Sequence, residues 1–183
     1  MANVLVPLAQ GCEELEAVTV IDLLRRAGIT VVSAGLDDQP VQASRGTVLL
    51  PDMSLDEALA QDYDMVVLPG GLPGADHLMN DARVIERVTR MANKGQYTAA
   101  ICAAPRVLAR AGVLDGKQAT SFPGAIDVSS IPGIRYSEQA VVRDGMVITS
   151  RGPGTAMDFA LELIEVLEGK PVRDKVEDAL QRP

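Results

Sequence analysis

The chain is poor in several residue types on which common classes of protein depend. It contains no tryptophan and only 3% aromatic residues, so its core has to be built from Val, Leu, Ile, Ala and Met, as is typical of buried parallel strands covered by helices. It has a single histidine and only two cysteines, Cys12 and Cys102, which lie far apart in the sequence. This spacing fits neither a disulfide framework nor a zinc site, so we expect no metal and no cofactor.

Basic residues are also in short supply. The formal net charge is −8, the sequence pI is about 4.6, and no basic cluster interrupts the acidic background. This balance opposes binding to nucleic acid or to anionic membranes. The N-terminus has no basic stretch before its short apolar run, and no segment approaches the ~20 apolar residues of a membrane span. We therefore expect a cytoplasmic protein.

The hydrophobic content of 47% is sufficient for one sizeable core, so residues 1–183 are expected to form one domain. Strand and helix patterns alternate along the chain, which predicts an α/β fold with a mostly parallel sheet covered on both faces. A hairpin is expected near the C-terminal end, followed by a helix that begins with a capping box of Thr155 and Asp158. The main predicted strands cover residues 3–9, 30–34, 65–68, 97–101, 140–143 and 146–150.

Active groups of open α/β sheets collect at the carboxyl ends of the strands. The segments 11–16, 69–74 and 102–105 are expected at this edge. Cys102 lies between a strand and the start of a helix, where the helix dipole would lower the pKa of its thiol. The alternative is a buried structural thiol, and the spacing alone does not decide between the two.

The first turn of the helix after the first strand contains Glu13, Glu14 and Glu16. Acidic residues in this position are commonly solvated and stabilise the helix dipole. Glu16 is the one that continues the inward face formed by Ala17 and Val20. A glutamate buried beside Cys102 would have a raised pKa, stay protonated and donate a hydrogen bond to a thiolate or sulfinate.

Cysteine hydrolases normally require a histidine base, and this chain has a single histidine that could serve as one. His77 follows the glycine-rich segment 69–74, lies among polar residues and is expected to be exposed. Arg45 and Arg151 each stand between a serine and a glycine. The two arginines are explained if their guanidinium groups bind loop carbonyls in turns. If they instead face the cleft at the carboxyl ends of the strands, they would form an anion site.

Four segments together resemble the ThiJ/PfpI superfamily, and within it the branch of the parkinsonism-associated protein deglycase and its bacterial YajL-like relatives. The resemblance runs in order from about residue 2 to 170. It implies a flavodoxin-like three-layer sandwich of the class I glutamine amidotransferase type, a homodimer, and an oxidation-sensitive cysteine on a nucleophile elbow. The segments are Glu13–Glu16, Val67–Gly71, Ala99–Pro105 and Thr149–Thr155.

The same resemblance implies roles for individual residues. Cys102 corresponds to the reactive cysteine, Glu16 to the protonated glutamate and Glu13 to the other pocket glutamate. The backbone amides expected to hold an oxyanion belong to Gly70, Gly71 and Ala103. The turn that contains Arg151 and Pro153 is expected near the partner's pocket, and Arg45 near the dimer interface.

Two positions depart from the family pattern. Proteolytic members carry histidine directly after the nucleophile, where this chain has Ala103, so a peptidase is not expected. The pocket histidine of the deglycase corresponds to Phe122, so any chemistry has to rely on Cys102 with Glu13 or Glu16. Cys12 is expected at the same sheet edge, either as a thiol that resolves a sulfenic acid at Cys102 or as a packed thiol.

The favoured function is a stress-response protein with glyoxalase III or protein deglycase-type activity. Its substrates would be methylglyoxal and the adducts that methylglyoxal forms with thiols or amines, and Cys102 would act with Glu16. The alternative is a non-enzymatic redox sensor or chaperone in which Cys102 becomes a sulfinate. A part in thiamine or thiazole metabolism ranks third, because the segment 69–74 lacks the ending of a phosphate-binding loop.

Overall fold

The computed structural model describes the whole chain, residues 1–183, and is built around a seven-stranded sheet with the order β10-β11-β7-β6-β1-β2-β5. Every neighbouring pair is parallel except β10 and β11, which form the predicted hairpin. The mostly parallel sheet expected from the sequence is thereby confirmed. The strands are β1 (Asn3–Leu8), β2 (Thr30–Gly35), β5 (Met53–Ser54), β6 (Met65–Leu68), β7 (Tyr97–Ile101), β10 (Val141–Asp144) and β11 (Val147–Ser150).

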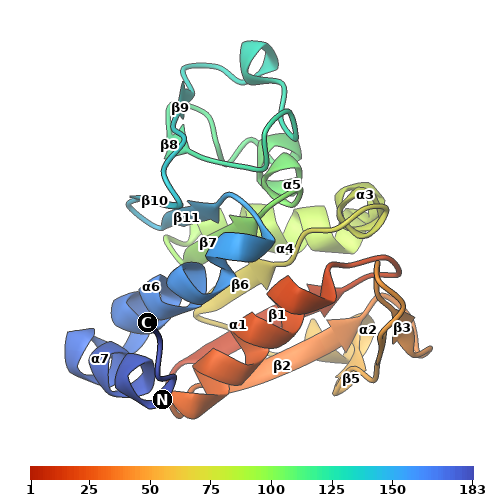
Figure 1. Cartoon of the computed structure of the whole chain (residues 1–183). Helices are drawn as coiled ribbons and strands as arrows, with labels where there is room; N and C mark the ends of the chain where they lie inside the picture. Colours follow the sequence, from red (N-terminus) through yellow and green to blue (C-terminus); the bar gives the residue numbers. More distant parts are fainter.

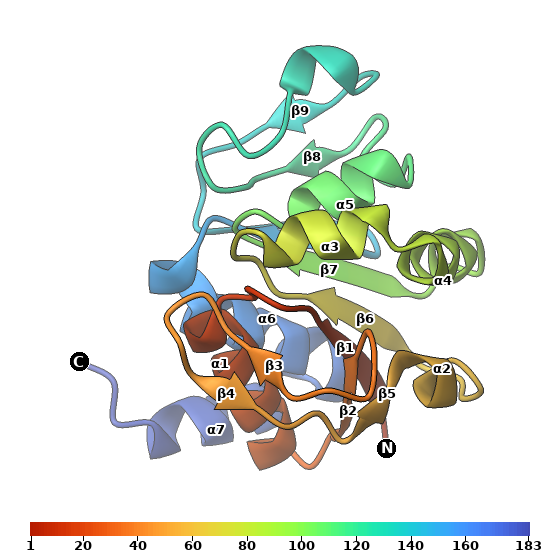
Figure 2. The ribbon, with the colours of Figure 1, turned by 90° about the vertical axis from the view of Figure 1, so that its right-hand side faces the viewer.

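Helices cover both faces of this sheet, which gives the flavodoxin-like three-layer sandwich (Figures 1 and 2). One face carries α1 (Glu14–Arg26) and α6 (Ala156–Glu168), and α7 (Lys170–Ala179) packs on α6. The opposite face carries α2 (Leu55–Ala58), α3 (Gly74–Asn80), α4 (Ala82–Asn93) and α5 (Pro105–Arg110). None of these helices has both the length and the apolar character needed to cross a membrane.

The two cores follow from the alternation of side chains along the strands. In β1, Val4 and Val6 pack in the core under α1 and α6, whereas Leu5 between them packs in the core under α4 and α5. All three side chains are completely buried. Because a parallel strand has covering helices on both faces, its sequence reads as a continuous apolar run.

Several small elements lie outside the main sheet. The strands β3 (Val41–Gln42) and β4 (Val48–Leu49) form an antiparallel pair. The parallel pair β8 (Gln118–Ala119) and β9 (Arg135–Tyr136), and also α3, were not predicted. These two strands have two residues each, which is too short for a period-two pattern to be detected. Two 3₁₀ turns are η1 (Val128–Ser130) and η2 (Pro153–Thr155).

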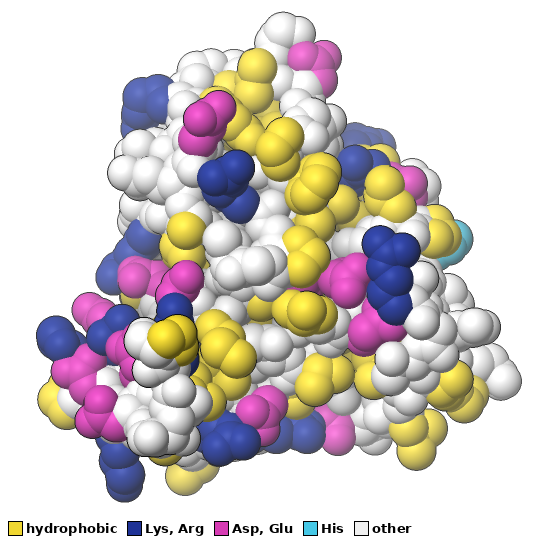
Figure 3. Space-filling model, in the orientation of Figure 1, with side chains coloured by type: hydrophobic (Ala, Val, Ile, Leu, Met, Phe, Trp, Pro, Cys, Tyr) yellow, Lys and Arg dark blue, Asp and Glu magenta, His cyan; other side chains and the backbone are white.

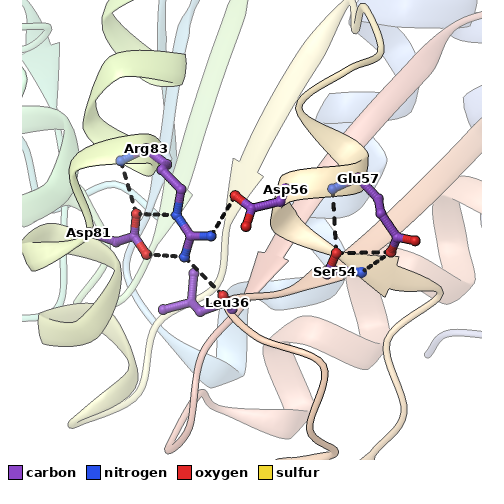
Figure 4. A network of polar contacts seen from close by, with 6 residues as sticks. All are labelled: Leu36, Ser54, Asp56, Glu57, Asp81 and Arg83. Atoms are coloured by element: carbon purple, nitrogen blue, oxygen red, sulfur yellow. Dashed lines mark hydrogen bonds and ion pairs between the residues drawn. The ribbon is translucent and has the colours of Figure 1, made fainter.

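A polar network ties the start of α4 to the neighbouring elements (Figure 4). The Asp81 side chain caps α4 by accepting the Arg83 N–H at 2.9 Å, and it also pairs with the Arg83 guanidinium at 2.6 Å. Arg83 reaches Asp56 in α2 at 2.7 Å and the Leu36 carbonyl at 2.9 Å. A network that joins three elements fixes the loops at the carboxyl end of the sheet.

The capping box predicted for the last long helix is wrong. Thr155 precedes α6, but its side chain makes no capping hydrogen bond to that helix. The Thr155 hydroxyl instead lies 2.6 Å from the Ser150 hydroxyl and 3.0 Å from the Gly152 carbonyl. Its hydrogen bonds therefore close the turn after β11 rather than the first turn of α6.

Candidate active site

Cys102 lies at a sharp turn between β7 and α5. Its backbone has φ 63°, one of only two positive values at non-glycine residues in the chain. The turn is held on both sides, because the Cys102 N–H donates to the Ser150 carbonyl at 2.9 Å and the Phe122 N–H donates to the Cys102 carbonyl at 2.8 Å. Left-handed backbone at a non-glycine residue persists only where the surrounding structure enforces it, and such positions cluster at functional sites.

Glu16 points from α1 into the protein and is 0% exposed. One carboxyl oxygen, Oε2, accepts the Gly70 N–H at 2.8 Å. The other, Oε1, is buried without a well-aligned hydrogen-bond partner, although the Cys102 thiol lies close enough to interact with the carboxyl group. Burial raises the pKa of Glu16 to about 7. The inward orientation and the raised pKa expected of Glu16 are both present.

The predicted lowering of the Cys102 pKa is not found. Burial, followed by the neighbouring Glu16 carboxylate, raises the pKa of the Cys102 thiol to about 12. The amides of Gly71 and Ala103 act in the opposite direction. The helix dipole does not lower the pKa of Cys102 because α5 has only six residues. Burial also disfavours two negative charges side by side. Burial therefore disfavours the state in which Glu16 and Cys102 are both ionised.

The glycine-rich loop after β6 lies directly against the start of α1. A Cβ atom built on Gly71, whose φ is +88°, would stand 2.4 Å from the Glu13 nitrogen, and one on Gly74 would stand 2.6 Å from the Cys12 Cα. This contact places the Gly71 amide near the Cys102 sulfur. The amide of Gly70 is occupied by Glu16, so it is not free to hold an oxyanion, in contrast to the expectation from the sequence.

An open cavity of about 470 Å³ lies over Cys102. Its wall includes Glu13, whose carboxylate accepts the Ser44 hydroxyl at 2.8 Å. Glu14 in turn holds the adjoining loop by accepting the Arg45 N–H at 3.0 Å. The lining residues are Glu13, Ser44, Arg45, Gly71, Leu72, Cys102, Ala103, Arg106, Phe122, Pro123, Gly124, Ala125 and Pro153.

The structure brings together most of the predicted site residues, but not all of them. Arg151 is outside the lining, and its guanidinium donates to the Glu138 carbonyl at 3.1 Å. Cys12 is a free thiol with no exposed surface, and burial raises its pKa to about 12. Its resolving role stays a prediction. His77 is exposed on α3 and does not line the cavity.

Arg106 is a charged lining residue that was not predicted from the sequence. It is the second residue of α5 and follows Cys102 by one helical turn. Its guanidinium forms an ion pair with Asp76 of α3 at 2.6 Å. The only signal in the sequence was a basic residue in the first turn of a helix, where the dipole disfavours it.

Known proteins resemble the chain over its whole length. The model of the DJ-1/PfpI family matches residues 2–166. Protein DJ-1alpha of Drosophila melanogaster is 46% identical over 97% of this chain and 83% of its own length. The crystal structure of Drosophila melanogaster DJ-1beta superposes with a TM-score of 0.93 at 41% identity, covering 100% of this chain and 98% of that one.

A further relative is named for an activity. Glutathione-independent glyoxalase DJR-1.2 of Caenorhabditis elegans is 34% identical over 92% of this chain and 89% of its own length. The resemblance inferred from the four sequence segments is confirmed, and so is its DJ-1-like branch. The chain belongs to the DJ-1/PfpI family.

Proposed function

We propose that the protein is a cysteine-dependent glyoxalase of the DJ-1 type that converts methylglyoxal into lactate. The observation that carries this proposal is the pairing of Cys102, at the floor of an open cavity, with a buried carboxyl group whose pKa is about 7. A group with a pKa near the working pH is well suited to take up and return a proton. A relative named as a glutathione-independent glyoxalase supports the same chemistry.

The reaction requires no external oxidant. Glu16 takes the thiol proton as the Cys102 sulfur adds to the aldehyde carbon, and it returns this proton to the aldehyde oxygen to give a hemithioacetal. Transfer of two electrons and a proton from that carbon to the neighbouring ketone carbon, while the hydroxyl proton moves to the ketone oxygen, gives a thioester of lactate. Water then cleaves the carbon–sulfur bond, which releases lactate and restores the thiol. The net change is the addition of one water molecule to methylglyoxal.

The backbone around the sulfur supports the charged stages of this reaction. The amides of Gly71 and Ala103 point toward the sulfur, where they stabilise negative charge. The cavity is open, so hemithioacetals and aminocarbinols on larger thiols or amines have access to the same group. Deglycase-type activity on glycated thiols or amines is therefore part of the proposal.

Lactate formation from methylglyoxal tests the proposal. Wild type should form many lactate molecules per chain, Cys102→Ser should form none above background, and Cys12→Ser should stay close to wild type. The last variant is the matched control, because it replaces the only other thiol in the chain. Lactate production that survives in Cys102→Ser, or no turnover by wild type, would refute the proposed glyoxalase activity of Cys102.

A second candidate is a redox sensor in which Cys102 is oxidised to a sulfinate. The observation in its favour is that the two amides and the Glu16 carboxyl group surround the sulfur, where they could bind sulfinate oxygens. In this case, mild peroxide should add two oxygen atoms to Cys102 while methylglyoxal is left unchanged. Intact mass measured alongside lactate separates the two functions.

We also propose that two copies of the chain form a homodimer through the face of α1 and α6. Hydrophobic side chains lie among the charged ones on this face (Figure 3). Leu15 and Val18 of α1 and Met157 of α6 are 51%, 46% and 44% exposed, on two helices that pack together. Light scattering should show a dimer for wild type and for Val48→Asp, and a monomer for Val18→Asp. Val48 is the control because it is exposed on β4. A dimer in all three proteins would rule out this interface.

A further inference from the structure

The cavity over Cys102 is much larger than methylglyoxal needs. Its volume of about 470 Å³ falls in the range that accommodates drug-sized ligands. A three-carbon aldehyde bound at the sulfur would leave most of this space empty. The lining residues away from the sulfur would therefore contact the rest of a larger substrate.

Two guanidinium groups reach the cavity wall. Arg45 and Arg106 are its basic residues, and Glu13 is the one carboxylate among the lining residues. The Arg45 guanidinium forms no ion pair in the protein, although the chain as a whole carries a net charge of −8. Asp76 and Glu14 lie beside this wall, so recognition of an anion has to come from a guanidinium with a free edge and not from the net charge of the cavity.

Arg106 is held in a fixed orientation with one edge left free. Its Nε donates to the Ala103 carbonyl at 3.1 Å, and its Nη1 donates to Asp76 at 2.6 Å. Its Nη2 has no hydrogen-bond partner in the protein, and Asp76 does not line the cavity. A planar guanidinium fixed in this way is suited to bind a carboxylate, because little conformational entropy is lost when the ligand binds.

Arg106 is held by the same turn that carries the reactive cysteine. Ala103, which accepts from Nε, directly follows Cys102, and its amide points toward the sulfur. The position of the guanidinium relative to the reacting sulfur is thus set within one helical turn. An anionic group a few atoms away from the aldehyde carbon would meet Arg106 while the aldehyde meets Cys102.

We propose that the cavity selects α-oxoaldehydes that carry a carboxylate, with Arg106 binding the carboxylate. This inference rests on the proposed function and names its substrate class. The reaction balances as it does for methylglyoxal: the aldehyde carbon is oxidised to a carboxylate, the ketone carbon is reduced to an alcohol, and one water molecule is consumed. The remote carboxylate takes no part in the bond changes.

The test compares 4,5-dioxopentanoate with its methyl ester, which has the same reacting end but no charge. Wild type should show a higher kcat/KM for the acid than for the ester. Arg106→Gln should lower this ratio by about tenfold to a hundredfold, mainly through KM, as expected for the loss of a charged hydrogen bond. Arg106→Lys, which keeps the charge, should retain part of the preference.

The matched control is Arg110→Gln, which removes the same charge from the exposed last residue of α5, outside the cavity. It should leave the ratio unchanged. An acid-to-ester ratio of one or less in wild type would overturn the proposal, and so would equal losses in Arg106→Gln and Arg110→Gln. Turnover of methylglyoxal alongside either result would leave the proposed function intact.

A binding measurement separates this proposal from a failure of catalysis. Both compounds can shield Cys102 from iodoacetamide, which is uncharged, and intact mass follows the modification. The acid should protect at a lower concentration than the ester in wild type, and this difference should disappear in Arg106→Gln. If methylglyoxal is never turned over, this protection still decides whether Arg106 recognises a carboxylate. Equal protection by acid and ester would refute that recognition.

Discussion

The two cysteines follow parallel strands at the same edge of the sheet, yet their surroundings differ in almost every respect. Cys12 follows β1, has no exposed surface and belongs to the apolar core under α1. Cys102 follows β7, has φ 63°, lines the open cavity and is approached by the amides of Gly71 and Ala103. Burial raises the pKa of both thiols to about 12, so thiol acidity does not distinguish them.

This comparison shows that access and a proton acceptor define the reactive thiol here. The charge of Glu16 acts on both Cys12 and Cys102, but only the Cys102 thiol lies close enough to its carboxyl group for a direct interaction. Cys12 is instead pressed against the glycine-rich loop, where Gly71 and Gly74 leave no room for a side chain. The same loop therefore covers one thiol and supplies an amide to the other.

The largest effect is expected from removing the proton acceptor that Cys102 has and Cys12 lacks. Glu16→Gln keeps the shape of the side chain and its contact with Gly70 but no longer takes up a proton. We expect kcat/KM for methylglyoxal to fall by about a thousandfold, within the range of general acid–base catalysis. Glu13→Gln, which alters the carboxylate bound to Ser44 at the cavity wall, should lose less than about tenfold. A larger loss in Glu13→Gln would transfer the role to that residue.

The pH dependence of stability should reveal the same group. Because burial raises the pKa of Glu16 from 4.5 to about 7, the folded protein keeps a proton that the unfolded chain releases. This contribution is fully present below about pH 4.5 and is lost as the pH rises through 7. Urea unfolding should show wild type losing on the order of 3 kcal/mol relative to Glu16→Gln over this window. Parallel curves for the two proteins would show that Glu16 is not protonated on folding.

A smaller effect is expected where the loop covers Cys12. Gly74→Ala places a Cβ 2.6 Å from the Cys12 backbone and should lower the free energy of unfolding by about 2 kcal/mol. Gly154→Ala is the control, because no atom lies within 4 Å of its added Cβ. Urea unfolding of both variants measures the difference. Equal stabilities would mean that the contact over Cys12 is loose.

Much of this arrangement was predictable from the sequence. The strand pattern before Cys102 and the helix start after it indicated a strand-to-helix turn at this residue. The inward stripe continued by Ala17 and Val20 selected Glu16 among three glutamates. These features depend on local periodicity and on the rule that parallel strands end at one edge. Both were therefore visible without coordinates.

The remainder depends on contacts between distant segments. The direction of the Cys102 pKa shift depends on burial and on the proximity of Glu16, and neither is encoded near residue 102. The use of the Gly70 amide by Glu16, and the place of Arg106 on the cavity wall, arise only when α1, α3 and α5 meet at the sheet edge. The spacing of residues in the sequence does not predict such contacts between distant segments.

The central claim is that the surroundings make Cys102, and not Cys12, the reactive group. Modification of the native protein by iodoacetamide, resolved at each cysteine by peptide mass, tests this most directly. We expect that Cys102 is modified while Cys12 stays free until the protein unfolds. Modification of Cys12 at an equal or faster rate in the folded protein would contradict it.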